Sequence, residues 1–307
     1  MESPRQNFVN CMSPAGIHRM AYREWGDPDN GKILLCVHGL SRNGRDFDEV
    51  AKAMCSEYRV VCPDIAGRGA SDFLKNPASY VVPQYVSDIT TLLARLQPQS
   101  VDWLGTSMGG LIALAFAGVV GMAEHAIAES DRNALPKTTG LSLRKLILND
   151  VGPAIEPASI ARIAGYVGVS MQFDSFEEAV LHMRTNAASF GPLSDEQWIE
   201  FTRAVMVQDG AKWRQHYDLS IAQAFEGLKD EKILKAGEAM LWGAFDSLQC
   251  PILLIRGEQS DLLSAQTARQ MQQRNSNLKM IEIEGTGHAP SLLPASQVQA
   301  VRQFLLS

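Results

Sequence analysis

The sequence predicts a protein of the α/β class, with a mostly parallel central sheet and an inserted helical cap domain. Short apolar or β-branched runs alternate along the chain with longer helical patterns, which is typical of βαβ units. Most of these runs are apolar throughout, as expected of central strands that are covered on both faces. Residues 153–248 interrupt the alternation, so we expect them to form a separate unit.

The strands of the parallel part are expected at residues 32–37, 59–63, 101–105, 145–149, 251–256 and 279–283. Residues 8–11 and 17–25 alternate more between apolar and polar side chains, which predicts an antiparallel hairpin at one edge of the sheet. Helical periodicity predicts helices over residues 47–56, 85–96, 109–120, 265–274 and 294–306.

The interrupting segment contains no strand-like run, whereas helical spacing and aromatic side chains accumulate in it. Gly152-Pro153 and Cys250-Pro251 supply the turn residues expected where a chain leaves and re-enters a scaffold. We therefore expect a core formed by residues 1–152 and 249–307, with residues 153–248 as the cap. Residues 129–141 are polar and rich in turn formers and predict an exposed loop, to which the sequence assigns no function.

The composition excludes several classes of protein. The chain contains 28 Lys and Arg residues and 34 Asp and Glu residues, which gives a net charge of −6, and it has no long runs of one charge sign. The chain therefore lacks the basic surface that binds nucleic acid or an anionic membrane, and we expect neither as a partner. A small molecule is the expected partner, and the sequence does not indicate an oligomeric state.

The cysteine pattern and the apolar runs predict a cytoplasmic protein. The five cysteines form no C-x-x-C pair and do not lie near a histidine at metal-ligand spacing, so we expect reduced thiols and neither a metal nor a cofactor. Residues 1–14 are polar and lack the pattern of a secretory signal. The longest apolar run, residues 111–123, is too short to span a bilayer.

The strongest chemical signal is the sequence G-T-S-M-G at residues 105–109. It directly follows an apolar strand pattern and directly precedes a helix of small residues. In such a turn the serine backbone is strained, and glycines are needed at the flanking positions where backbones pack closely. Ser107 is thereby exposed above the sheet, near the positive N-terminus of the following helix. We interpret Ser107 as a nucleophile.

A nucleophilic serine needs a base, and His288 is the best candidate among six histidines. It lies in G-T-G-H-A-P at residues 285–290, between the last strand and the last helix. Loops at the carboxyl ends of strands are where α/β folds place functional groups. His38 follows the first central strand and can instead support neighbouring loops by hydrogen bonding. Packing or surface roles are favoured for the others, His18, His125, His182 and His216.

The base must be oriented by a carboxylate. Asp261 is our first choice, because it lies on the loop that follows the strand at residues 251–256. Asp150, directly after another strand, is the alternative, and Glu258 is a weaker third candidate. The chain order Ser107, Asp261, His288 is nucleophile, acid, base.

These motifs together resemble the α/β-hydrolase superfamily, and the resemblance covers nearly the whole chain. The matching segments are VHGL at 37–40, PDIAGRGAS at 63–71, the turn at Ser107, GEQSD at 257–261 and GTGH at 285–288. Within the superfamily the sequence is similar to the capped esterase and enol-lactonase branch. It departs from haloalkane dehalogenases and epoxide hydrolases, which carry an aspartate where Ser107 stands.

The resemblance also implies the oxyanion hole, because in relatives two backbone N–H groups hold the carbonyl oxygen on which charge develops. Here these would be the N–H groups of Leu40 and Met108. The loop that contains His38, Arg42 and Asn43 lines the site in relatives, so these residues are candidate substrate contacts. An arginine there can bind a substrate carboxylate through two hydrogen bonds.

The expected function is that of a serine hydrolase that cleaves a carboxylic ester or a lactone through an acyl-enzyme on Ser107. A carbon–carbon bond hydrolase of ring-cleavage products would use the same residues, but the segment after His38-Gly39 is less rich in glycine than in that group. An acyltransferase or perhydrolase would share the acyl-enzyme and favour another nucleophile over water. A ligand receptor on this scaffold is disfavoured, because all three catalytic residue types are present.

Overall fold

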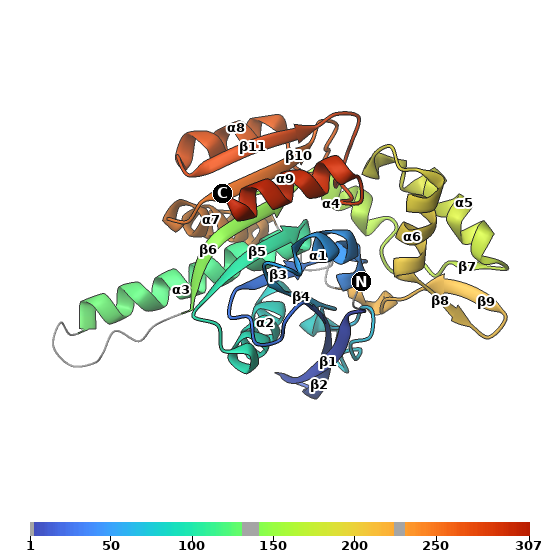
Figure 1. Ribbon diagram of the computed structural model, residues 1–307, viewed down its shortest axis with the longest axis horizontal. Helices are drawn as coiled ribbons and strands as arrows, with labels where there is room; N and C mark the ends of the chain where they lie inside the picture. Colours follow the sequence, from blue (N-terminus) through green and yellow to red (C-terminus); the bar gives the residue numbers. More distant parts are fainter. Residues whose placement is uncertain (1–2, 131–140, 224–230) are drawn as a thin grey trace.

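The computed structural model describes residues 3–130, 141–223 and 231–307. Residues 131–140, most of the loop expected over 129–141, lie outside these ranges. An eight-stranded sheet forms the centre of the described molecule, with helices on both faces (Figure 1). Of the helices described, none is both long and apolar enough to cross a membrane.

The sheet confirms the predicted α/β class with a mostly parallel sheet. Its strand order is β1 (Arg5–Ser13), β2 (Gly16–Trp25), β4 (Arg59–Pro63), β3 (Ile33–Val37), β5 (Ser100–Thr106), β6 (Ser142–Asn149), β10 (Ile252–Gly257) and β11 (Leu278–Ile283). From β4 to β11 all neighbours are parallel. β1 and β2 form the expected antiparallel edge hairpin, and β2 is also antiparallel to β4.

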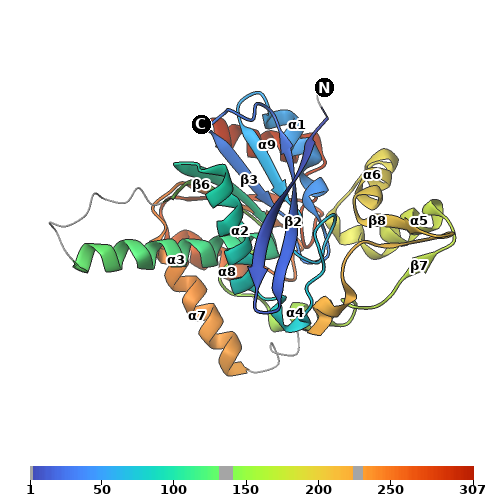
Figure 2. The same ribbon diagram turned by 90° about the horizontal axis from the view of Figure 1, so that it is seen from below.

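Two helical layers explain why the central strands are apolar throughout. The described helices of the core are α1 (Asp48–Met54), α2 (Val82–Leu96), α3 (Met108–Ser130), α7 (Glu231–Ser247), α8 (Ala265–Arg274) and α9 (Ala295–Leu306). α1 and α9 cover one face, and α2, α3, α7 and α8 cover the other (Figure 2). Along β3, Leu35 packs into the larger layer and Leu34 into the smaller one, so successive side chains are buried on opposite faces.

The insertion forms the described elements α4 (Pro157–Ala164), β7 (Gln172–Phe173), α5 (Phe176–Asn186), α6 (Asp195–Val205), β8 (Met206–Asp209) and β9 (Lys212–Gln215). The elements from β7 to β9 lie together beside the core (Figure 1), whereas Ile163 of α4 packs into the main core. Short 3₁₀ turns occur at Gly44–Phe47, Pro77–Ser79 and Ala188–Phe190. The expectation of a purely helical cap is wrong, because β7, β9 and β8 form a small antiparallel sheet. These strands are two to four residues long and largely polar, so no apolar run marks them.

Only the middle of the insertion has a hydrophobic core of its own. Its buried members are Phe173, Ala179, Met183, Ala187, Trp198, Phe201, Val205 and Met206. By contrast, Trp242 and Phe245 of α7 belong to the main core, where α7 packs against α3. Although α7 falls within residues 153–248, we therefore propose that the cap ends before it.

The close approach of α3 to the sheet requires glycine. A Cβ on Gly109 would overlap the carbonyl oxygen of Val37 in β3. Gly237 in α7 is the opposite case, since a Cβ there meets nothing within 4 Å. The two glycines are in helices but differ in their surroundings, which makes them a matched pair.

We expect Gly109→Ala to destabilise the protein by roughly 3 kcal/mol or more, because α3 must move off the sheet. Gly237→Ala should instead stabilise it by about 0.5–1 kcal/mol through helix propensity. Urea-induced unfolding of both variants measures this difference. Equal effects of the two substitutions would contradict the proposed contact.

Candidate active site

Ser107 occupies the tight turn between β5 and α3 that the sequence predicts. Its backbone has a φ of +51°, in the left-handed region that residues other than glycine rarely adopt. A Cβ on Gly105 would lie 2.5 Å from the backbone of Gly109, so both flanking glycines are needed for the turn to close. The N–H group of Ser107 donates to the carbonyl oxygen of Asn149 at 2.9 Å, which ties the turn to the end of β6.

The imidazole of His288 lies between Ser107 and a carboxylate. Its Nε2 is 2.8 Å from Ser107 Oγ, and its Nδ1 is 2.8 Å from Asp150 Oδ2. Asp150 is completely buried at the end of β6, with a φ of +57°. The structure thus brings together Ser107 and His288, the pair that the sequence predicts. Asp150, the second-choice candidate for the carboxylate, lies beside His288.

Asp150 is surrounded by hydrogen-bond donors. The N–H group of Gly257 donates to Oδ1 at 2.9 Å, and the Ser260 hydroxyl donates to Oδ2 at 2.7 Å. With His288 this makes three donors, and hydrogen bonds to the ionised form stabilise a buried carboxylate charge. The sequence analysis missed the contribution of Ser260, although it is adjacent to the aspartate that we first chose.

The expectation that Asp261 orients His288 is corrected by this geometry. Asp261 is half exposed, and its carboxylate forms a two-point ion pair with Arg162, at 2.6 Å to Nε and 2.9 Å to Nη2. The other candidate, Glu258, accepts the N–H group of Gly285 at 2.9 Å. The strand order gives the reason. β6 lies directly beside β5, so the residue after β6 is next to the serine turn, whereas β10 is one strand farther away.

Met108 follows Ser107 directly, and the residue before Leu40 lies beside Ser107. Met108 is the first residue of α3, and the first N–H groups of a helix have no acceptor within it. A Cβ on Gly39, the residue before Leu40, would lie 3.7 Å from Ser107 Cβ. Both segments therefore pass close to Ser107.

His38 is a buried structural residue and not a substrate contact. Its Nδ1–H donates to the carbonyl oxygen of Gly39 at 2.7 Å, and its Nε2 accepts the N–H group of Ile65 at 2.9 Å. The side chain is fully buried. Burial lowers its pKa to about 3, and the nearby positive charges of Arg68 and Arg42 act in the same direction. His38 thus stays neutral and joins the loops that follow β3 and β4.

Arg42 and Asn43 are buried against the cap instead of lining an open substrate site. Arg42 pairs with Asp46, and its guanidinium lies 3.7 Å from the centre of the Phe201 ring. Arg42 Nη2 also donates to the Phe201 carbonyl at 3.3 Å, and Asn43 Nδ2 donates to the Ala204 carbonyl at 2.5 Å. The expectation that they contact substrate is therefore replaced by a docking role.

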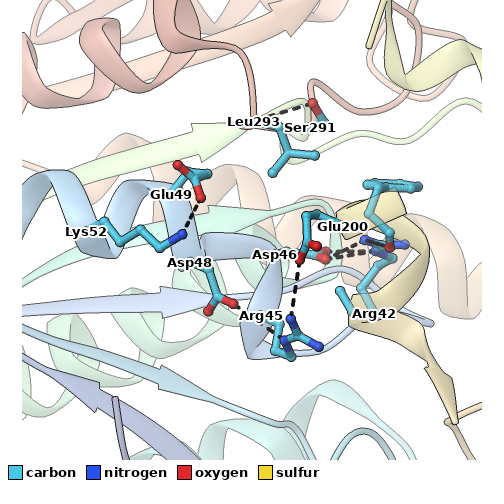
Figure 3. Close-up of a pocket in the computed structure, with 11 residues that line it drawn as sticks. Arg42, Arg45, Asp46, Asp48, Glu49, Lys52, Glu200, Ser291 and Leu293 are labelled. Atoms are coloured by element: carbon cyan, nitrogen blue, oxygen red, sulfur yellow. Dashed lines mark hydrogen bonds and ion pairs between the residues drawn. The ribbon is translucent and has the colours of Figure 1, made fainter. Parts of the chain in front are cut away.

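The carbonyls bound in this way belong to the last turn of α6. Arg45 binds a third one, that of Arg203, at 3.1 Å. The last carbonyls of a helix lack partners within it and carry partial negative charge, so cationic and amide side chains stabilise them. Beside these contacts lies a hollow of about 110 Å³, lined by alternating acidic and basic side chains such as Glu49 and Lys52 (Figure 3). Neither Ser107 nor His288 lines it.

The cap also contacts the loop of His288. The N–H group of Gly287 donates to the carbonyl oxygen of Ser189 at 2.6 Å. A Cβ on Gly191 would lie 2.6 Å from Thr286 Oγ1, so the two chains are in close contact. The cap is therefore bound both to the loop of Leu40 and to the loop of His288.

One cluster outside this site contains metal-ligand residue types. Ligand atoms of Cys11, His18 and Asp88 lie within 4.8 Å of one another. Cys11 and His18 face each other across the β1–β2 hairpin, a proximity that the sequence spacing does not reveal. His18 Nε2 is 2.9 Å from Asp88 Oδ2, and Gln84 donates to Oδ1 at 2.8 Å. These groups hydrogen-bond one another and tie the hairpin to α2.

Comparison with known proteins defines the family. Residues 34–301 match the model of the alpha/beta hydrolase family, so the chain belongs to this family and is a hydrolase. It is 48% identical, over 98% of both chains, to a protein of Cupriavidus necator named 3-hydroxybutyrate-oligomer hydrolase.

Solved structures give the same result. A putative hydrolase from Rickettsia typhi has a TM-score of 0.82 and 29% identity, covering 99% of both chains. An alpha/beta hydrolase from Novosphingobium aromaticivorans has a TM-score of 0.81 and 31% identity, covering 100% of this chain and 99% of the other.

The depressed pKa of His38 predicts a pH-dependent stability. In the unfolded chain a histidine takes up a proton near its ordinary pKa of 6.5, whereas folded His38 does so only near 3. The contribution is fully present above about pH 6.5 and is lost as the pH falls toward 3, at about 1.4 kcal/mol per pH unit. His38→Asn removes this titration.

We therefore expect the wild type to lose roughly 2 kcal/mol more stability than His38→Asn between pH 6.5 and pH 4.5. Urea unfolding at the two pH values measures both losses, and the carboxylates that the two proteins share cancel in the comparison. Parallel pH dependences would show that His38 titrates normally in the folded protein.

Proposed function

We propose that the chain is a serine hydrolase that cleaves carboxylic ester bonds through a covalent acyl-enzyme on Ser107. The observation that carries this proposal is the continuous hydrogen-bonded chain from Asp150 through His288 to Ser107. A nucleophile, a base and an acid that orients the base are the three parts that acyl transfer by serine requires.

Proton transfer follows from the two hydrogen bonds of His288. Nδ1–H donates to the Asp150 carboxylate, which leaves Nε2 as the acceptor of the Ser107 proton. As Ser107 Oγ attacks the ester carbonyl, Nε2 takes the proton and the imidazolium forms. The buried charge of Asp150 stabilises that cation, because the two are in direct contact in a site of low dielectric.

The ester oxygen becomes negatively charged in this step. We assign the stabilisation of this charge to the N–H groups of Leu40 and Met108, to which the N-terminus of α3 adds a favourable dipole. Collapse of the tetrahedral intermediate breaks the bond to the alcohol, which leaves with the proton from His288. Water then attacks the acyl-enzyme, with His288 as base, and releases the acid and free Ser107.

For the substrate we propose short oligomers of 3-hydroxybutyrate, in which each bond between units is a carboxylic ester. The support is the relative of that name, which matches this chain over nearly its full length. Hydrolysis of a lactone, hydrolysis of a vinylogous diketone and transfer of the acyl group to another nucleophile are alternative reactions. All three would use the same residues, so tests with different substrates are needed to distinguish them. As location we propose the reducing cytoplasm, since the spacing of the five cysteines favours reduced thiols.

The choice between the two aspartates is directly testable. Asp150→Asn should lower kcat about 10³–10⁴-fold, because an amide cannot hold His288 in the required tautomer. Asp261→Asn, the matched control, should remain within about twofold of the wild type, since exposed ion pairs contribute little. Hydrolysis of p-nitrophenyl butyrate measures both, and a larger loss in Asp261→Asn would reverse the assignment.

We expect Ser107→Ala to lose both its esterase activity and its labelling by a fluorophosphonate. These two losses together would identify Ser107 as the nucleophile. If Ser107→Ala hydrolyses esters at the parent rate, the acyl-enzyme mechanism is wrong.

The substrate proposal predicts that linear dimers and trimers of 3-hydroxybutyrate are cleaved to the monomer. We expect kcat/KM at least about tenfold higher than for simple alkyl esters of equal length, because selectivity reflects contacts made in the transition state. Chromatography of released 3-hydroxybutyrate measures the rates. A higher kcat/KM on a lactone or a vinylogous diketone would contradict this substrate class.

A further inference from the structure

A fully buried arginine lies behind the nucleophile. Arg68 is in the loop after β4, between Gly67 and Gly69, which have φ values of +83° and +53°. The loop is held by the chain that leaves the cap, where Arg68 forms an isolated β-bridge with Tyr217. Two glycines in the left-handed region let the chain turn so that the side chain between them points inward.

The guanidinium contacts both residues of the oxyanion hole. Arg68 Nε donates to the carbonyl oxygen of Leu40 at 2.7 Å, and Nη2 lies 3.7 Å from Met108 Sδ. His38 binds the carbonyl oxygen of Gly39, which belongs to the same peptide group as the Leu40 N–H. The carbonyls before and after that N–H are therefore both held, which fixes the direction in which it points.

Arg68 has no counterion for its positive charge in the part of the chain that the structure describes. Among the described residues, its guanidinium makes no ion pair with a carboxylate, and its remaining hydrogen bonds go to the Ala66 carbonyl at 2.7 Å and the Tyr85 hydroxyl at 2.9 Å. It also lies 5.1 Å from the centre of the Tyr85 ring and 5.6 Å from that of Tyr80. Asp64, on the same loop, instead accepts the N–H groups of Gly44 and Ala70. An arginine keeps its charge in proteins, and burying that charge without a carboxylate partner costs free energy. The arrangement therefore calls for a functional reason.

We propose that Arg68 is a positioning residue of the oxyanion hole, whose uncompensated charge also stabilises the tetrahedral intermediate. This inference rests on the proposed function. The charge interacts weakly with the neutral ester and strongly with the oxyanion that forms from it. An interaction that is stronger in the transition state raises kcat without tightening substrate binding.

The test replaces the charge in two ways and measures kcat and KM on p-nitrophenyl butyrate. Arg68→Met should lower kcat about 10–100-fold and leave KM within about threefold. Inhibition by an alkyl boronic acid, which forms an anionic tetrahedral adduct on serine, should weaken by a similar factor. A boronic acid that binds Arg68→Met and the wild type equally would overturn the inference.

Arg68→Lys provides a readout that a purely structural role would not give. Burial without a counterion lowers the pKa of a lysine, so its charge is lost as the pH rises. The quantity to compare is the kcat of the variant divided by the kcat of the wild type at the same pH. For Arg68→Lys we expect this ratio to approach one at low pH and to fall to the ratio of Arg68→Met at high pH. This comparison still decides the question if Arg68→Met does not fold, and a pH profile parallel to the wild type would overturn the charge role.

Lys145 offers a matched control. It is also a buried cation that binds backbone carbonyls, those of Phe304, Leu305 and Ser307, but it lies on β6 away from the serine turn. Lys145→Met should lower stability without changing kcat. If Ser107→Ala retains activity, both the proposed function and this inference fail. If Ser107→Ala is inactive while Arg68→Met matches the wild type, only the role of Arg68 is rejected.

Discussion

The buried carboxylate of Asp150 is the interaction on which the geometry of this site depends. It joins three segments that are distant in the chain: the end of β6, the loop after β10 through Gly257 and Ser260, and the loop of His288. Each donor satisfies part of a charge that would be costly to bury alone. The same hydrogen bonds that make the buried charge tolerable therefore also place the imidazole against Ser107.

The cap is part of this arrangement and not merely a cover. Arg42, Asn43 and Arg45 bind the carboxyl end of α6, and Ser189 binds the loop of His288. Both loops also carry groups of the proposed mechanism, since Leu40 is on one and His288 on the other. A displacement of the cap would consequently strain both loops, and with them the positions of Leu40 and His288.

The residues that the sequence singled out and that the structure brings together are those with a local cause. Ser107 and His288 were found because close backbone approach and flexible loops leave glycines within a few residues of each. The two candidate acids were ranked in the wrong order, with Asp150 as the alternative to Asp261, because both lie between Ser107 and His288 in chain order and both follow a strand. The small cap sheet was missed for another reason, since strands of two to four residues leave no detectable period.

The sequence by itself determined the α/β class, the edge hairpin, the serine turn and the histidine loop, because periodicity and steric demands act between neighbouring residues. Only the tertiary structure decided which aspartate faces His288, since that depends on β6 lying next to β5. It also decided that Arg42 and Asn43 dock the cap and that Arg68 contacts Leu40 behind Ser107, with no carboxylate partner among the described residues. These outcomes depend on contacts between segments that no local pattern records.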